Sequence, residues 1–313
     1  MKNVLVLGGT GFVGAHVCEK LVRAGWNITV PTRRWVNARP VLHLPTVRVV
    51  ELDVHDEPAL AQALAGHMAV VNLIAILHGT QAAFERVHVD LPQKLGRACQ
   101  AAGVRQLVHV SALGANAESP KSSPSMYLRS KGQGEVVLTM AATGQPGFDL
   151  TLLRPSVIFG ADDKFLNLFA KLQKVFPVMP LAGADTRFQP VWVQDVAAAV
   201  VRSLQGGLSP SSRVIELCGP DVFTLKELVQ LSAQLAGVRM GRGRPVLPLP
   251  PWLGRVQARL MELAPGDPLM SRDNLASMQI DNVASGQLLG LASLGITSSA
   301  LTAIAQGYLA PQK

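Results

Sequence analysis

The sequence predicts an α/β fold, a doubly wound parallel sheet with a smaller C-terminal lobe. Strand-like and helix-like segments alternate through the first half of the 313-residue chain. The strand-like segments are near-continuous runs of Val, Ile and Leu, which is typical of a parallel sheet covered on both faces. A glycine-rich turn directly follows the first of them. We therefore expect a nucleotide-binding domain over residues 1–156 and a smaller lobe, interleaved with the sheet, over residues 157–313.

The elements of the first half follow from the apolar pattern and its punctuation. The predicted strands span residues 4–8, 27–32, 47–53, 69–76, 106–112 and 148–156. The predicted helices span residues 12–24, 58–65, 81–102 and 126–142. Gly25 and Gly103 follow the first and third helices, and glycine is common where a helix ends.

Proline and glycine become frequent after residue 156, so the pattern is weaker there. We predict helices at residues 163–174, 195–205, 224–236 and 251–263, and a strand at residues 213–219. The last helix carries an apolar stripe: Trp252, Leu253, Val256, Leu260 and Leu263. The preferred interpretation is that this stripe covers the core of the lobe. The alternative is that the helix, with Arg255 and Arg259, docks on an anionic membrane or a membrane complex.

Charge and cysteine content narrow the classes of function. The net charge is +8, but the basic residues are scattered and no recognition motif accompanies them, so nucleic-acid binding is not predicted. Three cysteines without a CxxC pair predict free thiols, a reducing compartment and no metal site.

The longest apolar run, "VVNLIAIL", is far shorter than the roughly 18 residues that span a bilayer. We expect a cytoplasmic protein, with peripheral contact at the inner membrane as the alternative; the oligomeric state is not predicted.

The glycine turn "GGTGFVG" predicts a Rossmann-type dinucleotide site. Gly8, Gly11 and Gly14 lie between the first strand and the first helix. Glycines at such positions permit the tight turn, the approach of a pyrophosphate and close helix–strand packing. The amino end of the helix then offers free N–H groups to the anion. Residues expected to contact the cofactor here are Gly8, Thr10, Gly11, Phe12, Val13 and Gly14.

The end of the second strand favours NADP(H), with NAD(H) as the alternative. An NAD site needs an acidic residue for the ribose hydroxyls at this point, but the chain has Thr32 followed by Arg33 and Arg34. Two guanidinium groups suit a 2′-phosphate. Asp53, after the third strand, is expected to accept from the adenine amino group, to act as a turn residue before the following helix, or to do both.

With these motifs in place, the sequence resembles the extended and atypical branches of the short-chain dehydrogenase/reductase superfamily. The segments that carry the resemblance are "GGTGFVG", Asp53, Asn72, Ser111, Tyr127-x-x-x-Lys131, "LRPSVIFG" (153–160) and "FQPVWVQDVAAAV" (188–200). Within the superfamily, "VSALGA" followed by "SPSMYLRSKGQGE" is most similar to the group that includes the nucleotide-binding accessory subunit of respiratory complex I (alpha subcomplex subunit 9) and its bacterial relatives.

The resemblance implies a role for each matching residue. Tyr127 would be the general acid/base, and Lys131 would hold the nicotinamide ribose and lower the pKa of the tyrosine. The four-residue spacing agrees, because it places a cation on the same helix face as the phenol. Further cofactor contacts are expected at Val54, Asn72, Leu73, Ile74, Ala75, His88, Ser111, Pro155 and Val157.

Two departures from the family pattern put catalysis in question. Ala112 stands where a Ser or Thr would polarise the substrate carbonyl, and Ser111, one residue earlier, is the candidate replacement. His88 stands where many members have asparagine, and it either contacts the cofactor or packs. The leading hypothesis is an NADP(H)-binding oxidoreductase acting on a hydrophobic carbonyl or a quinone-related ligand. The alternatives are a non-catalytic structural or assembly factor of complex I or quinone machinery, and a nucleotide-sugar epimerase or dehydratase.

Overall fold

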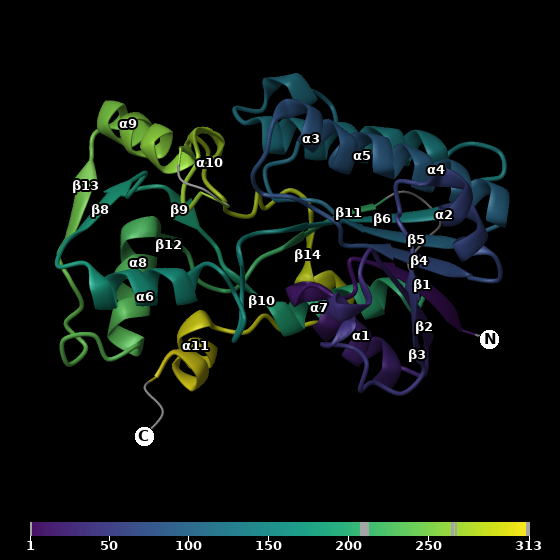
Figure 1. Ribbon diagram of the computed structural model, residues 1–313, viewed down its shortest axis with the longest axis horizontal. Helices are drawn as coiled ribbons and strands as arrows, with labels where there is room; N and C mark the ends of the chain where they lie inside the picture. Colours follow the sequence, from purple (N-terminus) through teal and green to yellow (C-terminus); the bar gives the residue numbers. More distant parts are fainter. Residues whose placement is uncertain (1, 207–212, 264–265, 267, 311–313) are drawn as a thin grey trace.

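The centre of the molecule is an eight-stranded parallel sheet with the strand order β14-β11-β6-β5-β4-β1-β2-β3 (Figure 1). The computed structural model describes residues 2–206, 213–263, 266 and 268–310. The strands of the sheet are β1 Asn3–Leu7, β2 Asn27–Thr32, β3 Val47–Glu51, β4 Ala69–Asn72, β5 Gln106–Val110, β6 Asp149–Pro155, β11 Arg213–Leu217 and β14 Leu289–Gly290. The strand order reverses between β1 and β4, and ligands of such sheets bind at the carboxyl ends beside that reversal. The predicted doubly wound fold is confirmed.

Helices cover both faces of the sheet (Figure 1). The helices α1 Phe12–Arg23 and α7 Val193–Leu204 pack together on one face. On the other face lie α2 Glu57–Leu64, α4 Leu91–Ala102 and α5 Met126–Ala142. Because the central strands are covered on both faces, their consecutive apolar side chains are buried, which explains the continuous Val/Ile/Leu runs.

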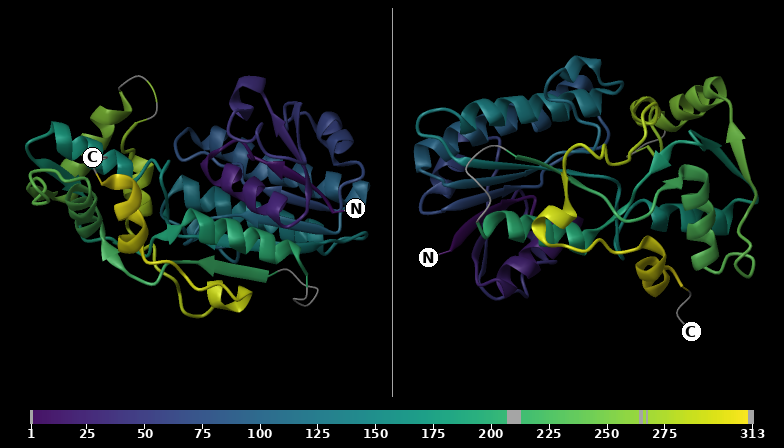
Figure 2. Two further views of the ribbon diagram at one scale, coloured as in Figure 1. Left: turned by 90° about the horizontal axis from the view of Figure 1, so that it is seen from below. Right: turned by 180° about the vertical axis from the view of Figure 1, so that it is seen from behind.

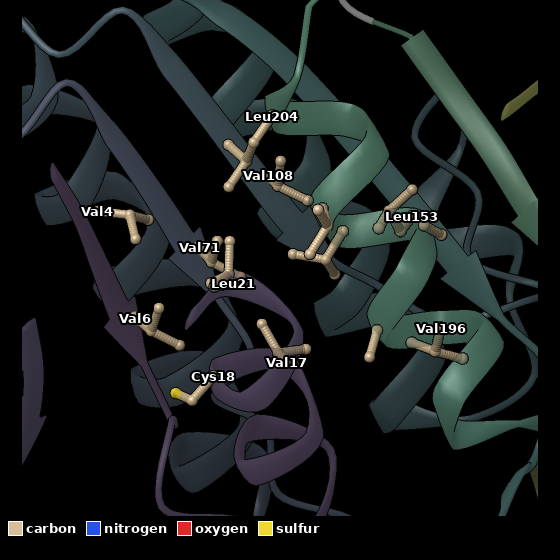
Figure 3. Packing of buried hydrophobic residues seen from close by; sticks show 14 of the residues in the cluster. Val4, Val6, Val17, Cys18, Leu21, Val71, Val108, Leu153, Val196 and Leu204 are labelled. Carbon is tan, nitrogen blue, oxygen red and sulfur yellow. The ribbon is translucent and has the colours of Figure 1, made fainter. Parts of the chain in front are cut away.

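Strand β1 illustrates this double burial. Val4 and Val6 belong to the core on the side of α1 and α7, and Leu5 and Leu7 belong to the core on the side of α2 and α4. Figure 3 shows the first of these cores, with side chains of α1 and α7 packed against the strands. All four β1 side chains are fully buried, and burial of each such side chain contributes roughly 1.5–3 kcal/mol.

The long helix predicted over residues 81–102 contains an irregularity. It consists of α3 Gln81–Glu85, a π-helical segment Arg86–Asp90, and α4. The preceding strand is shorter than predicted because β4 ends at Asn72, whose side-chain oxygen accepts the Ile74 N–H at 3.1 Å and turns the chain. By contrast, α5 has the predicted bounds, residues 126–142, and begins at the N-cap Ser125.

The elements after residue 156 divide between the smaller lobe and the sheet (Figure 2). The lobe contains helices α6 Leu166–Val175, α8 Leu225–Leu235, α9 Pro251–Glu262, α10 Arg272–Ser277 and α11 Leu301–Leu309. Its short strand pairs are β8 Met179–Ala182 with β13 Val246–Leu249, and β9 Arg187–Phe188 with β12 Phe223–Thr224. A further pair, β7 Ile158–Phe159 with β10 Val191–Trp192, precedes α7. Strands β11 and β14 and helix α7 return to the large sheet.

Helix α9 is oriented opposite to the preferred interpretation of its sequence. Its buried residues are the small Gly254 and Ala258, whereas Trp252, Val256 and Leu260 are exposed. A Cβ at position 254 would lie 2.7 Å from the Ala182 Cβ, so the helix approaches β8 through its glycine. The apolar stripe therefore does not cover the core of the lobe.

No helix within the described ranges combines the length and the apolar character that crossing a bilayer requires.

Candidate functional site

The glycine turn adopts the geometry that a pyrophosphate site needs. Gly8 has φ +79°, in the left-handed region, and a Cβ there would lie 3.2 Å from the Leu73 backbone carbon. A Cβ at Gly14 would lie 2.2 Å from the Gly8 carbonyl oxygen, so only glycine allows α1 to pack on the turn. Gly11, the N-cap of α1, is exposed and provides no side-chain cap. The first amides of α1 are thus open to an anion.

Two arginines extend from the end of β2. Thr32 is buried, and its hydroxyl donates to the Arg34 carbonyl oxygen at 3.1 Å, which fixes the turn. Arg33 and Arg34 are exposed, and neither forms an ion pair with another residue in the described ranges. Glu51, paired with Thr32 in the sheet, accepts the Trp35 N–H at 3.2 Å. The two guanidinium groups are therefore available for a phosphate.

The segments after β3 and β4 border the same edge of the sheet. Asp53 is exposed and accepts the His55 N–H at 3.0 Å, the geometry of its predicted turn role; contact with adenine stays a prediction. Val54 behind it is buried. After β4, the Leu73 and Ile74 backbones lie against Gly8, and Ala75 is exposed.

Asn72 anchors the end of β4 from inside the protein. Its side chain is buried, and its amide lies 3.1 Å from the His109 Nδ1 on the neighbouring strand β5. Together with the bond to Ile74, this fixes the path of the chain toward Ala75. Asn72 thus has a structural role, and its contact with the cofactor stays a prediction.

Tyr127 and Lys131 lie one turn apart on α5, as predicted, but their environments differ. The Lys131 ammonium is buried and donates to the Val110 carbonyl oxygen at 2.8 Å. The Tyr127 side chain is half-buried, and its hydroxyl makes no hydrogen bond to the residues that the structure describes. Burial raises the pKa of Tyr127 to about 12. Desolvation causes this rise, and the lowering that the resemblance implies is not found in the free protein.

Ser111 provides a further hydroxyl, on the residue after the Lys131 contact. It follows Val110, the residue that Lys131 binds, and its side chain is buried. The Ser111 Oγ has no hydrogen-bond partner among the described residues. A buried hydroxyl without a partner costs about 1–3 kcal/mol, so a ligand that pairs with it gains that energy. Ala112 beside it is also buried and has no donor.

His88 is built into the protein interior. Its Nε2 accepts the Ile76 N–H at 3.1 Å, so its Nδ1 carries the proton and donates to the Ser130 Oγ at 2.8 Å. Burial, and then the Lys131 charge, lower the pKa of His88 to about 2. Both ring nitrogens are engaged, and the ring lies edge-on to Tyr127 at 5.5 Å between centroids. Packing is thus the role that this geometry supports.

Sequence reasoning missed two carboxylates, one within α5 and one at its amino end. Glu135 is fully buried and receives two hydrogen bonds from Arg154 of β6, at 2.9 and 2.6 Å. Asp273 of α10 accepts the N–H groups of Met126 at 2.7 Å and Tyr127 at 3.1 Å. A carboxylate at the amino end of a helix is favourable, so Asp273 fixes the helix that presents Tyr127. Its distance along the chain leaves no local signal.

The segment after α10 also contacts the turns that border the site. Asn282 accepts from the Ser156 Oγ at 2.6 Å and from the Val157 N–H at 3.1 Å. Its amide donates to the Leu113 carbonyl oxygen at 3.4 Å, and Pro155 accepts the Leu113 N–H at 2.9 Å. The predicted contacts Pro155 and Val157 therefore lie in a turn that this segment holds in place.

The buried ammonium of Lys131 should make stability depend on pH. Burial lowers its pKa from 10.5 to about 8, against the opposite effect of Glu135. Between these values the unfolded chain binds more protons, so this group makes stability rise with pH. In Lys131→Met this contribution vanishes. The free energy of unfolding of the variant minus that of the wild type should therefore fall by about 2 kcal/mol between about pH 7 and pH 9.5.

Urea unfolding of both proteins at a series of pH values measures that difference. Burial also raises the pKa of Cys18 and Cys99 to about 12, but these thiols are common to both proteins and cancel in the comparison. A difference that stays constant with pH would mean that Lys131 titrates normally.

Comparisons with known proteins agree with this geometry. The model of the "NAD dependent epimerase/dehydratase family" matches residues 4–218. The NADH dehydrogenase (ubiquinone) 1 alpha subcomplex subunit 9 of Arabidopsis thaliana is 34% identical over 233 residues, 72% of this chain and 56% of that protein. The chain thus spans about half of that relative. The same subunit of Rattus norvegicus is 30% identical over 303 residues, 95% of this chain and 76% of that protein.

Two further similarities come from an enzyme and a solved structure. The ceramide reductase of Caulobacter vibrioides is 29% identical over 240 residues, 75% of this chain and 71% of that protein. The structure of MoeE5 in complex with UDP-glucuronic acid and NAD has a TM-score of 0.71, covers 98% of this chain and 97% of that chain, and is 19% identical. At that identity the similarity concerns the fold alone.

Proposed function

Because the chain belongs to the NAD dependent epimerase/dehydratase family, an extended branch of the short-chain dehydrogenase/reductases, we propose that it is an NADP(H)-dependent oxidoreductase. Its substrate would be the carbonyl of a hydrophobic, membrane-associated molecule, such as a lipid or a quinone-related compound. The observation that carries the proposal is the free hydroxyl of Tyr127, one helical turn from Lys131, whose ammonium binds Val110, the residue before the unpartnered Ser111. The relatives that act on ceramide or are named for ubiquinone support the substrate class.

The residues fit a reduced nicotinamide nucleotide. The glycine turn and the first amides of α1 would hold its pyrophosphate, and Arg33 and Arg34 would hold a 2′-phosphate. When bound, the cofactor supplies hydride to the carbonyl carbon of the substrate. Ser111 orients the carbonyl by donating a hydrogen bond, and Tyr127 transfers its phenolic proton to the carbonyl oxygen, so the product is an alcohol.

The Tyr127 phenol can act as the proton donor. A phenol is protonated at neutral pH already at its ordinary pKa near 10, and burial raises the pKa of Tyr127 further, to about 12. The protonated phenol is the form that donates in the reduction of a carbonyl, whereas oxidation of an alcohol needs the phenolate as a base.

The double variant Arg33→Ala/Arg34→Ala tests the choice of cofactor. It should weaken NADPH binding roughly 10- to 100-fold, because charge-assisted hydrogen bonds to a phosphate are lost. NADH binding should change little, since NADH has no 2′-phosphate. Calorimetric titration of both nucleotides measures the effect, and Arg48→Ala/Arg202→Ala, which removes two other exposed arginines, is the control. An equal loss of affinity for NADPH and NADH would contradict the predicted preference for NADP(H).

A second candidate is a nucleotide-binding structural or assembly factor of a membrane-bound respiratory complex. It is favoured by the two relatives that are complex I subunits and by Ala112 at the position of the missing donor. Measuring NADPH consumption with long-chain ketones, ceramide precursors and quinones distinguishes this candidate from the oxidoreductase. Cofactor binding without consumption across this panel would favour the structural role. Conversion of a UDP-sugar without net NADPH consumption would instead indicate an epimerase.

A further inference from the structure

Helix α9 presents a fixed apolar face to solvent. Its outer face consists of Trp252, Val256, Leu260 and Leu263, which are 63%, 50%, 64% and 79% exposed. At 100° per residue these four positions fall within an arc of about 80°. Exposed apolar side chains gathered in this way mark an interaction site more often than chance exposure does.

The opposite side of α9 explains why the outer face cannot turn inward. Gly254 and Ala258 are buried, and a Cβ on Gly254 would lie 2.7 Å from the Ala182 Cβ. The helix thus contacts β8 so closely that no larger side chain fits between them. The Glu262 carboxylate also pairs with Arg272 of α10 at 2.8 Å. The small residues and this ion pair fix the orientation of the helix.

The charges beside the outer face are positive. Arg255 and Arg259 are exposed, and neither forms an ion pair with a residue that the structure describes. Glu262 is the acidic residue of the helix, and Arg272 neutralises it. Two free guanidinium groups therefore flank the apolar arc, a pattern that complements a surface of negative charge.

We propose that the outer face of α9 docks on an anionic lipid bilayer, with its four apolar side chains in the interface and both arginines at the phosphates. The helix is convex and its apolar arc is small, whereas stable protein interfaces bury about 800 Å² per partner. An interfacial helix gains free energy from each inserted side chain and each lysine or arginine near an anionic surface. The bilayer is therefore the occupant that matches this face.

Docking in this way connects the bilayer to the candidate site. Helix α10 packs against α9, and its Asp273 caps the helix that carries Tyr127. Two consecutive contacts thus join the docked face to the proposed proton donor. Docking on the bilayer does not require turnover. The binding experiment therefore tests the docking independently of the proposed function.

Co-sedimentation of the full-length protein with vesicles tests the proposal. The wild type should bind vesicles of phosphatidylcholine with phosphatidylglycerol, and bind phosphatidylcholine alone at least tenfold less. Arg255→Glu/Arg259→Glu should weaken binding to the anionic vesicles roughly 30-fold or more. Leu260→Asp should weaken it at least tenfold.

Matched variants elsewhere keep the test specific. Met140→Asp changes an apolar residue that is 69% exposed at the end of α5, and Arg48→Glu/Arg202→Glu reverses two other exposed arginines. Both should bind like the wild type. Brominated lipids should also quench tryptophan fluorescence in the wild type and much less in Trp252→Phe. Absence of binding by a folded wild type, or equal losses in the control variants, would overturn the proposal.

Discussion

The Tyr127→Phe substitution is expected to lower turnover of NADPH with a carbonyl substrate by roughly 10²–10⁴-fold, the usual contribution of a general acid. The hydroxyl that is lost has no hydrogen bond within the described structure, so the fold should not depend on it. The ring remains and keeps its edge-on contacts with Phe84 and His88. Steady-state kinetics give the turnover, and the thermal shift with NADPH gives the cofactor affinity, which should change little.

The chain offers a matched control, because it contains only one other tyrosine. Tyr308 donates its hydroxyl hydrogen to the Asp163 carboxylate at 2.9 Å. Tyr308→Phe should therefore cost about 1.5–3 kcal/mol of stability, the range for a hydrogen bond to a charged group, and leave turnover nearly unchanged. If Tyr127→Phe reduces turnover no more than Tyr308→Phe does, Tyr127 is not the proton donor.

Gly134→Ala is expected to lower the free energy of unfolding by about 3 kcal/mol, at the upper end of the range for overpacking a core. A Cβ at this position would lie 2.2 Å from the His88 carbonyl oxygen. The obstacle is backbone of the π-helical segment, which cannot move aside as a flexible side chain does. Helix α5 would have to shift away, and with it Tyr127 and Lys131.

Gly307→Ala is the matched control for that substitution. Gly307 also lies within a helix, α11, and nothing stands within 4 Å of its Cβ position. There the better helix propensity of alanine should stabilise the protein by about 1 kcal/mol. Urea denaturation measures both variants. A loss below about 1 kcal/mol for Gly134→Ala would show that the two helices separate easily.

The fold was predictable where the local signals agree. The glycine turn, the continuous apolar strands and the N-cap Ser125 each have a strong physical cause, and β2 and α5 have the predicted bounds. The strands β8 and β13 were not predicted. They are short and each contains a proline, Pro180 or Pro248, which argues against a strand interior when only the sequence is read.

The site was predictable as far as it follows from motifs that are local in sequence. The spacing places Tyr127 and Lys131 on one helix, and the alternation of strands and helices places Ser111 at the same edge of the sheet. The contacts of Asp273 and Asn282 come from residues far along the chain and have no signature nearby. Periodicity also identified the apolar stripe of α9, but the small Gly254 and Ala258 determine which side faces the protein.

The contacts of Asp273 and Asn282 have a consequence for how the protein is made. During synthesis the segment from β1 to β6 emerges first, and with its loops and helices it contains every residue predicted to bind the nucleotide except Val157, which follows two residues later. Asp273 and Asn282, which hold the amino end of α5 and the turn after β6, emerge more than 100 residues later. A ribosome-bound chain therefore has the sequence for its nucleotide site before it has the sequence that fixes its proton donor.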